Sequence, residues 1–313
     1  MSFTGGGSDL REFYSQNGYG AVVSAAIKKY MYVVIHPYFH DKIRIKYSRT
    51  EDVRSVEEIQ HPLVRECLKK VQLGTGFEIA SFADVPAGTG LGSSSAFAVG
   101  LLNALYACKG KIVTKERLAA QACEIEIDIL GEPIGKQDQY AVACGNINYI
   151  RFHKDETVDV SPLFLTEEAK GMLERKLYLY YVGGERKASS ILAEQKKNIA
   201  HGNTYANLCK MVSLSDRLRD FLLRGEIDSV GAILHEGWMY KKELASNISN
   251  GAVDTLYQTA RSFGAEGGKL LGAGGNGFLL LFCRNHENLA ASMACKTLPF
   301  QIDQEGTKIL FYE

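Results

Sequence analysis

The pattern of hydrophobic and polar positions predicts a mixture of strands and helices in the N-terminal half of the chain. Residues 42–47, Lys-Ile-Arg-Ile-Lys-Tyr, alternate polar with apolar side chains, which is typical of a half-exposed antiparallel strand. Residues 95–107 are almost all apolar or small, so they predict a helix that is buried on every side. Runs rich in β-branched and aromatic residues predict further strands at residues 21–26, 30–35, 77–82, 147–152 and 177–182.

The C-terminal half has a different pattern, with longer amphipathic and charged segments. Because strands and helices mix without regular βαβ alternation, the whole chain predicts an α+β fold with antiparallel sheet. The change in pattern falls between residues 155 and 175, and we divide the chain into residues 1–165 and 166–313. The segments predicted beyond the boundary are helices at 188–224, 227–244, 252–263 and 287–296, and strands at 277–282 and 308–312.

Composition narrows the class of protein. The chain has 313 residues, of which 46% are hydrophobic, enough for a sizeable core in two domains. Lys+Arg and Asp+Glu both number 36, so no net field favours nucleic acid or an acidic membrane as a partner. The seven cysteines show no Cys-x-x-Cys spacing, and no apolar run is long enough to cross a bilayer. We therefore expect a cytoplasmic protein with free thiols, and we leave a homodimer open.

The glycine-rich run at residues 86–95, Pro-Ala-Gly-Thr-Gly-Leu-Gly-Ser-Ser-Ser, predicts a phosphate site. Its backbone N–H groups can converge on an anion, and the helix after it adds unpaired N–H groups and the positive end of its dipole. The run lacks the lysine of a Walker loop and the glycine spacing of a dinucleotide loop. A glycine-rich connection before a buried helix is the alternative. The residues predicted to hold the phosphates are Pro86, Gly88, Gly90, Leu91, Gly92, Ser93, Ser94 and Ser95.

This run resembles the central motif of the GHMP kinases, the superfamily of galactokinase, homoserine kinase, mevalonate kinase and phosphomevalonate kinase. Residues 2–10, Ser-Phe-Thr-Gly-Gly-Gly-Ser-Asp-Leu, are similar to the first motif of the superfamily. Residues 269–278, Lys-Leu-Leu-Gly-Ala-Gly-Gly-Asn-Gly-Phe, are similar to its third motif. Residues 130–140, with residues 5–10, are most similar to the D-glycero-D-manno-heptose 7-phosphate kinases. The short basic strand that usually precedes the first motif is shortened or missing here.

The resemblance implies a fold and a set of cofactors. The fold is a two-domain GHMP kinase fold, with an N-terminal domain like ribosomal protein S5 domain 2 and a ferredoxin-like C-terminal domain. The N-terminal domain would carry the ATP phosphate loop and the catalytic residues. ATP and Mg²⁺ are the implied cofactors.

Asp138 is the candidate catalytic base. It comes after a Gly-Glu-Pro-Ile-Gly turn, where a carboxylate can be aimed into a cleft, and the resemblance implies the same role. A capping or turn-stabilising aspartate is the alternative. Lys136 is a second candidate catalytic residue, because a lysine there would lower the pKa of Asp138 or offset phosphate charge.

Glu126 is the candidate Mg²⁺ ligand. A helix is predicted from Thr114 to about residue 130, and at roughly 100° per residue Glu126 lies nearer the apolar stripe than Glu124 does. A carboxylate at the edge of a core requires a partner, and a metal would serve. The resemblance implies that a loop serine shares the Mg²⁺, either Ser95, which we assign, or Ser94; an N-cap role is the alternative for each. The stripe consists of Leu118, Ala122, Ile125 and Ile129.

Asp9 is the candidate sugar anchor, because a short carboxylate after three glycines can accept hydrogen bonds from two adjacent hydroxyls. An N-cap for a helix at residues 10–16 is the alternative. A sugar phosphate also requires cations, and we assign Arg186 among several candidates because arginine binds phosphate with two hydrogen bonds. The glycine run of the third motif could close over the substrate, although a tight hairpin with an Asn-Gly turn is also consistent with it. The residues predicted to bind substrate are Gly7, Ser8, Asp9, Arg186, Gly274 and Gly275.

The expected function rests on the resemblance. It is an ATP- and Mg²⁺-dependent kinase that phosphorylates the anomeric hydroxyl of D-glycero-D-manno-heptose 7-phosphate, giving a heptose 1,7-bisphosphate for nucleotide-activated heptose. One alternative is a kinase of an unphosphorylated sugar such as fucose or galactose. Another is a non-catalytic sugar-binding regulator on the same fold. The expected partners are therefore ATP and a small sugar phosphate.

Overall fold

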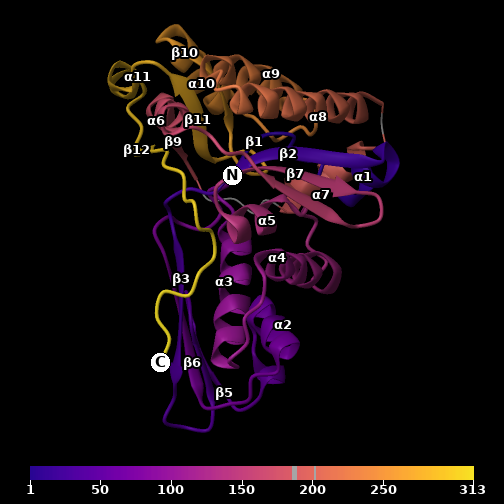
Figure 1. The fold of residues 1–313 in the computed structure, drawn as a ribbon, viewed down its shortest axis with the longest axis vertical. Helices are drawn as coiled ribbons and strands as arrows, with labels where there is room; N and C mark the ends of the chain where they lie inside the picture. The colour runs from indigo at the N-terminus through magenta and orange to yellow at the C-terminus, as the bar shows by residue number, and fades with distance from the viewer. Residues whose placement is uncertain (185–188, 201) are drawn as a thin grey trace.

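In the computed structural model, residues 1–184, 189–200 and 202–313 are described, and their strands form three four-stranded sheets with helices packed beside them (Figure 1). All neighbouring strands are antiparallel except one pair. This arrangement confirms the α+β prediction.

The first sheet forms the narrow end of the molecule, which is the lower part of Figure 1. Its order is β3-β6-β4-β5, and β4 runs parallel to β6. In β4 the predicted alternation holds, because Ile43 and Ile45 are buried while Lys46 is exposed. The strands are β3 (Met31–Pro37), β4 (Ile43–Lys46), β5 (Thr50–Val53) and β6 (Phe77–Ala83).

A central helix, α3 (Ser93–Cys108), packs along this sheet and against three other helices of the N-terminal half. No residue between 95 and 107 is exposed, as the apolar run predicted. Thr114 caps the next helix as expected, because its side chain accepts a hydrogen bond from the N–H of Arg117 at 3.3 Å. The other elements here are η1 (Val56–Glu58), α2 (Pro62–Val71), α4 (Lys115–Cys123), η2 (Glu124–Ile129) and α5 (Gln137–Cys144).

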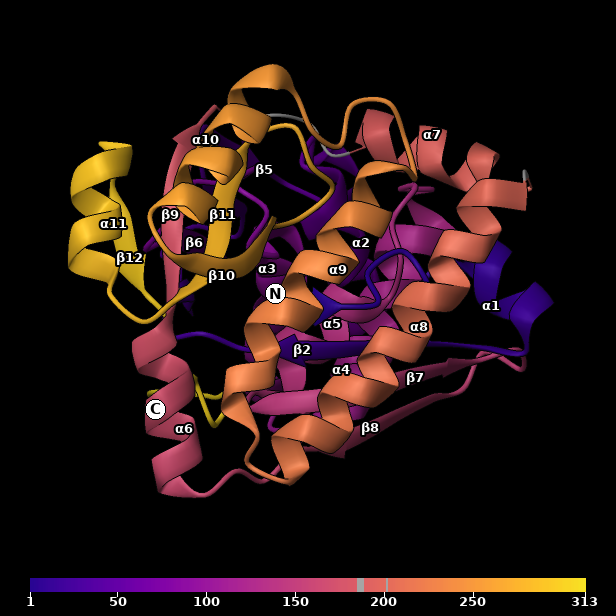
Figure 2. The same ribbon diagram turned by 90° about the horizontal axis from the view of Figure 1, so that it is seen from above.

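The second sheet has the order β1-β2-β7-β8, and α8 (Gly202–Leu223) and α9 (Val230–Lys242) pass over it (Figure 2). The glycines of the first motif come directly after β1, a three-residue edge strand that pairs with β2. The strand before the first motif is therefore present in short form. The remaining elements are β1 (Ser2–Thr4), α1 (Arg11–Asn17), β2 (Tyr19–Ala25), β7 (Ile147–His153) and β8 (Val158–Pro162).

The third sheet has the order β10-β11-β9-β12, which read from the other edge is the 4-1-3-2 order of a ferredoxin-like β-α-β-β-α-β unit. Its strands are β9 (Leu177–Gly183), β10 (Ala265–Leu270), β11 (Gly277–Cys283) and β12 (Thr297–Pro299). The remaining helices are α6 (Glu167–Lys176), α7 (Ser189–Asn198), η3 (Ile227–Ser229), α10 (Gly251–Ser262) and α11 (His286–Met293).

Two apolar cores hold these layers together. The smaller core lies between the first sheet, α2, α3 and α4, and it includes Ile43, Leu68 and Leu102. The larger core joins the second and third sheets through α8 and α9, and it includes Phe3 and Trp238. Segments on both sides of residue 165 therefore share one core, and the division into residues 1–165 and 166–313 stays a proposal.

Three sequence-based expectations about elements are wrong. Residues 308–312 do not form a strand, and Leu310 and Phe311 are exposed. The segment 188–224 contains two helices, α7 and α8, instead of one. Ile129 does not continue the apolar stripe of α4 and is half exposed, because the helix widens into the π-helical turn η2 and the 100° spacing no longer applies.

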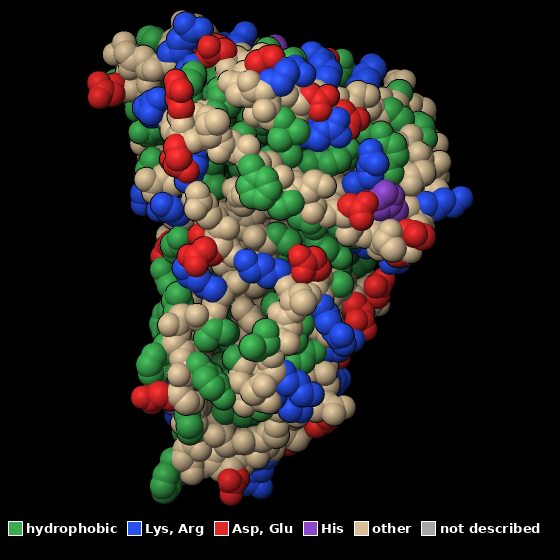
Figure 3. All heavy atoms as spheres, in the orientation of Figure 1, with side chains coloured by type: hydrophobic (Ala, Val, Ile, Leu, Met, Phe, Trp, Pro, Cys, Tyr) green, Lys and Arg blue, Asp and Glu red, His purple; other side chains and the backbone are tan. Residues whose placement is uncertain are grey.

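The surface agrees with the balanced charge of the sequence. Figure 3 shows lysine and arginine interspersed with aspartate and glutamate over the visible face. Within the described part of the chain, no helix combines the length and apolar character that crossing a bilayer would require.

Candidate active site

The first glycine loop, residues 86–92, connects β6 to α3 and leaves the start of that helix open. Gly88, Gly90 and Gly92 have φ of 75°, 82° and 75°, a left-handed conformation that side chains disfavour. Gly92 is the N-cap of α3, so no serine caps this helix and that alternative is wrong. The first N–H groups of α3 and its dipole are thereby available to an anion.

A second glycine loop, residues 271–277, packs directly on the first. A Cβ on Gly90 would lie 2.7 Å from the carbonyl oxygen of Leu271, and a Cβ on Gly277 would lie 2.3 Å from that of Thr89. The two backbones therefore touch, and only glycine fits at the contact. The second loop does join antiparallel β10 and β11, but it is longer than a two-residue Asn-Gly turn.

Gly274 and Gly275 of the second loop lie against another segment. The N–H of Gly275 donates to the carbonyl oxygen of Ile248 at 2.9 Å, and a Cβ on Gly274 would lie 2.5 Å from that same oxygen. Their predicted contact with substrate stays a prediction.

Asp138 lies beside the first glycine loop. It is the second residue of α5, and its Cγ would lie 3.6 Å from a Cβ placed on Gly92. The residues on either side of it donate elsewhere, Gln137 to Asp9 and Gln139 to Glu126. Among the described residues none donates to the half-buried Asp138 carboxylate, which leaves it able to accept a proton from a ligand.

Glu126 is buried, with 2% of its surface exposed. Its Oε1 accepts a hydrogen bond from the Ser94 hydroxyl at 2.6 Å, and its Oε2 accepts one from Gln139 Nε2 at 2.8 Å. Burial raises the pKa of Glu126, although these two hydrogen bonds oppose the shift. The structure thus brings Ser94 to this carboxylate, whereas Ser95 is buried in the helix.

These groups fit a magnesium ion. Mg²⁺ is usually held by one or two carboxylates together with substrate phosphates. Glu126 is a buried carboxylate with no ion-pair partner among the described residues. It lies beside the N-terminal start of α3, where phosphate would bind. Within the part of the chain that the structure describes, no set of three acidic, histidine or cysteine side chains could hold a metal, so phosphate oxygens and water would complete the coordination.

Asp9 is held between the glycines of the first motif and the start of α5. Its Oδ1 accepts from the N–H of Gly7 at 2.9 Å, and its Oδ2 accepts from the N–H of Gln137 at 3.0 Å. Burial raises the pKa of Asp9 to about 6, against the effect of these hydrogen bonds. The N-cap of α1 is Leu10, so the capping alternative for Asp9 is wrong.

Three other predicted residues are not shown in their predicted roles. Ser8 is buried, and its hydroxyl exchanges hydrogen bonds of 3.0 Å with the backbone of Ala21 in β2. Lys136 directs its ammonium to Glu156 at 2.5 Å, and no ion pair between described residues joins it to Asp138. Arg186 lies outside the described residues.

Two buried lysines were missed by sequence reasoning. Lys241 Nζ donates to the carbonyl oxygens of Leu270 at 3.2 Å and Gly272 at 2.5 Å, and so anchors the second glycine loop. Lys269 Nζ donates to the carbonyl oxygen of Ser2 at 2.9 Å. Helical spacing carried the signal for Lys241, because it lies three positions after Trp238 on the buried stripe of α9.

The pKa values of both lysines depend on the charged residues of the site. Burial lowers the pKa of Lys241 to about 8, while the negative charges of Asp138 and Asp9 oppose the shift. Burial also lowers the pKa of Lys269 well below its ordinary value, and the charge of Lys241 lowers it further. The charge of Asp138 therefore acts on both lysines, and the charge of Asp9 acts on Lys241.

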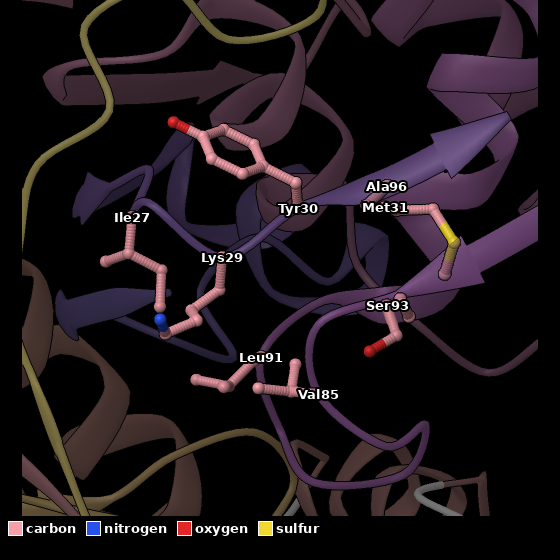
Figure 4. Close-up of a pocket in the computed structure, with 9 residues that line it drawn as sticks. Ile27, Lys29, Tyr30, Met31, Val85, Leu91, Ser93 and Ala96 are labelled. Atoms are coloured by element: carbon pink, nitrogen blue, oxygen red, sulfur yellow. The ribbon is translucent and has the colours of Figure 1, made fainter.

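Two small pockets flank these groups. The loop pocket borders the first glycine loop, with Val85 and Leu91 on the loop side and Tyr30 and Met31 on the side that leads into β3 (Figure 4). The second pocket, which we call the Asp9 pocket, is lined by Asp9, Arg11, Glu12, Tyr14, Ile127, Ile134, Lys136 and Lys196. One pocket is thus mainly apolar and borders the start of α3, and the other is largely polar and contains Asp9.

Comparisons with known proteins agree with this geometry. The chain matches the family GHMP kinases N terminal domain over residues 62–146 and GHMP kinases C terminal over residues 218–299, together more than half of its length. It is similar to the D-glycero-alpha-D-manno-heptose 7-phosphate kinase of Campylobacter jejuni, with 27% identity over 90% of this chain and 86% of the relative. It is 26% identical to the galactokinase of Thermococcus kodakarensis, over 64% of this chain and 65% of that one.

The fold agrees as well. The crystal structure of a D-glycero-D-manno-heptose 1-phosphate kinase from Bacteroides thetaiotaomicron superposes with a TM-score of 0.80 and 26% identity, covering 100% of this chain and 97% of the other. The α+β two-domain arrangement is therefore shared with an enzyme of this superfamily. The chain belongs to the GHMP kinase superfamily and is an ATP-dependent phosphotransferase with an alcohol acceptor.

Proposed function

We propose that this kinase phosphorylates the anomeric hydroxyl of D-glycero-D-manno-heptose 7-phosphate, giving the 1,7-bisphosphate. The observation that carries the proposal is the position of Asp138, an unpaired carboxylate among the described residues, beside the start of α3 and next in sequence to the residue that binds Asp9. The similarity to a heptose 7-phosphate kinase over 90% of this chain supports the choice of acceptor.

The two pockets divide the substrates between them. The loop pocket, lined by Tyr30, Met31, Val85 and Leu91, suits the adenine ring of ATP because its walls are mainly apolar and aromatic. From there the phosphates extend over the first glycine loop to the N–H groups of α3. The sugar enters the Asp9 pocket, where ionised Asp9 accepts hydrogen bonds from its hydroxyls.

The transfer then depends on position and charge. Asp138 accepts the proton of the anomeric hydroxyl as that oxygen bonds to the γ-phosphorus, and the bond to ADP breaks. Glu126 and Ser94 would hold Mg²⁺, which neutralises charge on the phosphates when bound. Lys241 fixes the second glycine loop against the first, so the loop that carries the phosphates is held in place.

A second acceptor class is favoured by the charge of the Asp9 pocket. Arg11, Lys136 and Lys196 are each already paired with a carboxylate, so the pocket has no uncommitted cation among the described residues. Such a pocket suits an uncharged sugar. The galactokinase and fucokinase relatives support this alternative.

The experiment that decides is a substrate panel. Purified protein with Mg-ATP is given heptose 7-phosphate, heptose, fucose, galactose and mannose, and ADP release is followed together with ³¹P NMR of the product. Turnover with heptose 7-phosphate at the highest kcat/KM supports the proposal, and higher kcat/KM with an unphosphorylated sugar refutes it. We place the reaction in the cytoplasm, consistent with seven free cysteines, and keep a homodimer as an assembly to be tested.

A further inference from the structure

Four hydrogen bonds from the Asp9 pocket converge on one carboxylate that sequence reasoning did not single out. Arg11 donates from Nε to Oε1 of Glu156 at 3.0 Å and from Nη2 to Oε2 at 3.2 Å. Tyr14 donates its hydroxyl to Oε2 at 2.9 Å, and Lys136 donates its ammonium to the same oxygen at 2.5 Å. We call Arg11, Tyr14 and Lys136 the cradle.

The cradle is a built feature of the fold. Tyr14 is fully buried, Lys136 is 9% exposed, and the ammonium of Lys136 lies 5.2 Å from the centre of the Tyr14 ring. Arg11 presents two N–H groups side by side, the arrangement that binds a carboxylate or a phosphate with two hydrogen bonds. All three side chains line the same pocket as Asp9.

Glu156 itself is unusual for its position. It lies in the turn between β7 and β8 with φ of 71°, a left-handed conformation that favours glycine or asparagine. The turn therefore gives no reason for a glutamate. Its side chain is 42% exposed, so it can swing away from the cradle into solvent. Burial opposes its ionisation, but the bonds from Lys136, Arg11 and Tyr14 outweigh burial and hold the pKa of Glu156 below its ordinary value.

We propose that the cradle is a subsite for an anionic group of the acceptor, a phosphate monoester, and that Glu156 fills this subsite until the acceptor enters. The proposal deepens the proposed function and rests on it for the identity of the sugar. Phosphate oxygens can accept hydrogen bonds from the same donors that now bind Glu156. Asp9, in the same pocket, would bind hydroxyls at the other end of the acceptor sugar. Glu156 then sets specificity, because an acceptor phosphate must displace it.

The test measures binding to protein whose nucleotide site is filled with Mg-AMPPNP, so that phosphate cannot occupy the first glycine loop. Isothermal titration calorimetry is run with inorganic phosphate, heptose 7-phosphate and heptose. In Glu156→Gln we expect inorganic phosphate and heptose 7-phosphate to bind at least fivefold more tightly, because the competing charge is gone. Heptose should bind within twofold of wild type.

Three further variants separate recognition of the acceptor from an effect on structure. Arg11→Gln should weaken the binding of heptose 7-phosphate at least tenfold and the binding of heptose less than twofold. Asp159→Asn is the matched control, since it removes an exposed carboxylate from the same hairpin, where it pairs with His153 at 2.7 Å, and it should change neither affinity. Glu156→Gly, which suits the backbone of the turn, should match Glu156→Gln in binding and should not lower the unfolding temperature.

The outcomes distinguish this inference from the proposed function. If inorganic phosphate binds neither wild type nor Glu156→Gln, or if Glu156→Gln changes heptose and heptose 7-phosphate equally, the cradle is a structural ion pair and the subsite is refuted. If the cradle binds phosphate but heptose 7-phosphate gives no turnover, the subsite stands and the choice of sugar fails.

Discussion

The Ser94 hydroxyl donates to Glu126 across 2.6 Å, which joins the first turn of α3 to the π-helical turn η2. The other carboxylate oxygen is held by Gln139 of α5 at 2.8 Å. Three segments that are separate in sequence thereby fix one buried acid at the point where the phosphates of ATP would lie.

Replacing Glu126 should weaken the binding of Mg²⁺. In Glu126→Gln we expect the Mg²⁺ concentration for half-maximal rate to rise about 10–100-fold, because the amide cannot supply the charge. Ser94→Ala should give a smaller rise. Glu124→Gln is the control, since Glu124 lies two positions away, is 46% exposed and pairs with Lys70. An unchanged Mg²⁺ requirement in Glu126→Gln would contradict the assignment.

Removing the candidate base should slow chemistry without weakening nucleotide binding. In Asp138→Asn we expect kcat to fall about 10²–10⁴-fold, the usual contribution of a positioned base. The Kd for AMPPNP, measured by calorimetry, should stay within twofold of wild type. Glu132→Gln, an exposed acid in the preceding turn, serves as the control. Full activity in Asp138→Asn would remove it from the mechanism.

The contact between the two glycine loops can be tested with a pair of alanines. Gly90 and Gly110 both have positive φ, 82° and 64°, but a Cβ on Gly110 meets nothing within 4 Å. Gly110→Ala should therefore cost only the backbone strain, about 1–2 kcal/mol. Gly90→Ala should lower the free energy of unfolding in urea by more than this. It should also weaken the binding of AMPPNP, because the backbone of Leu271 must move. Equal losses in the two variants would argue against the contact.

Asp9 should make stability fall as the pH rises from about 4 to 6. Its pKa is about 6 in the folded chain, against about 4 when unfolded, so the folded state binds more protons across this interval. The loss should be on the order of 3 kcal/mol. The measurement is urea unfolding of wild type and Asp9→Asn between about pH 4 and 6. The free energy of unfolding of the variant should not show this decline. The KM for the acceptor should also rise below pH 6, as Asp9 becomes protonated.

Lys241 should have the opposite effect at high pH. Its pKa is about 8 in the folded chain and about 10.5 when unfolded, so the unfolded state binds more protons between these values and stability rises with pH. Lys241→Met should abolish the rise, as seen in urea unfolding at about pH 7.5 to 10. Lys242→Met is the control, because Lys242 is adjacent, part-exposed and paired with Asp254. A rise that persists in Lys241→Met would show another group to be responsible.

Local sequence signals predicted the elements and the loops but not the long-range pairings. Alternation in β4, the apolar run of α3 and the cap at Thr114 depend on neighbouring residues, so the sequence alone predicted them. The pairing of Ser94 with Glu126 and of Lys136 with Glu156 depends on segments brought together only by folding. Residues 308–312 are rich in apolar β-formers, which favoured a strand, but they pair with no strand among the described residues.

The π-helical turn makes the orientation of Glu126 depend on a count of residues. Bonds such as Leu130 N–H to Ile125 O, five positions apart, accommodate one more residue than an ordinary turn. Deleting a single neighbour of Glu126 between positions 124 and 129 would restore the usual pitch and rotate the rest of the helix by about 100°. Because both the glutamate and its serine partner would survive such a deletion, a change in chain length alone would be enough to misalign the carboxylate that we propose as the Mg²⁺ ligand.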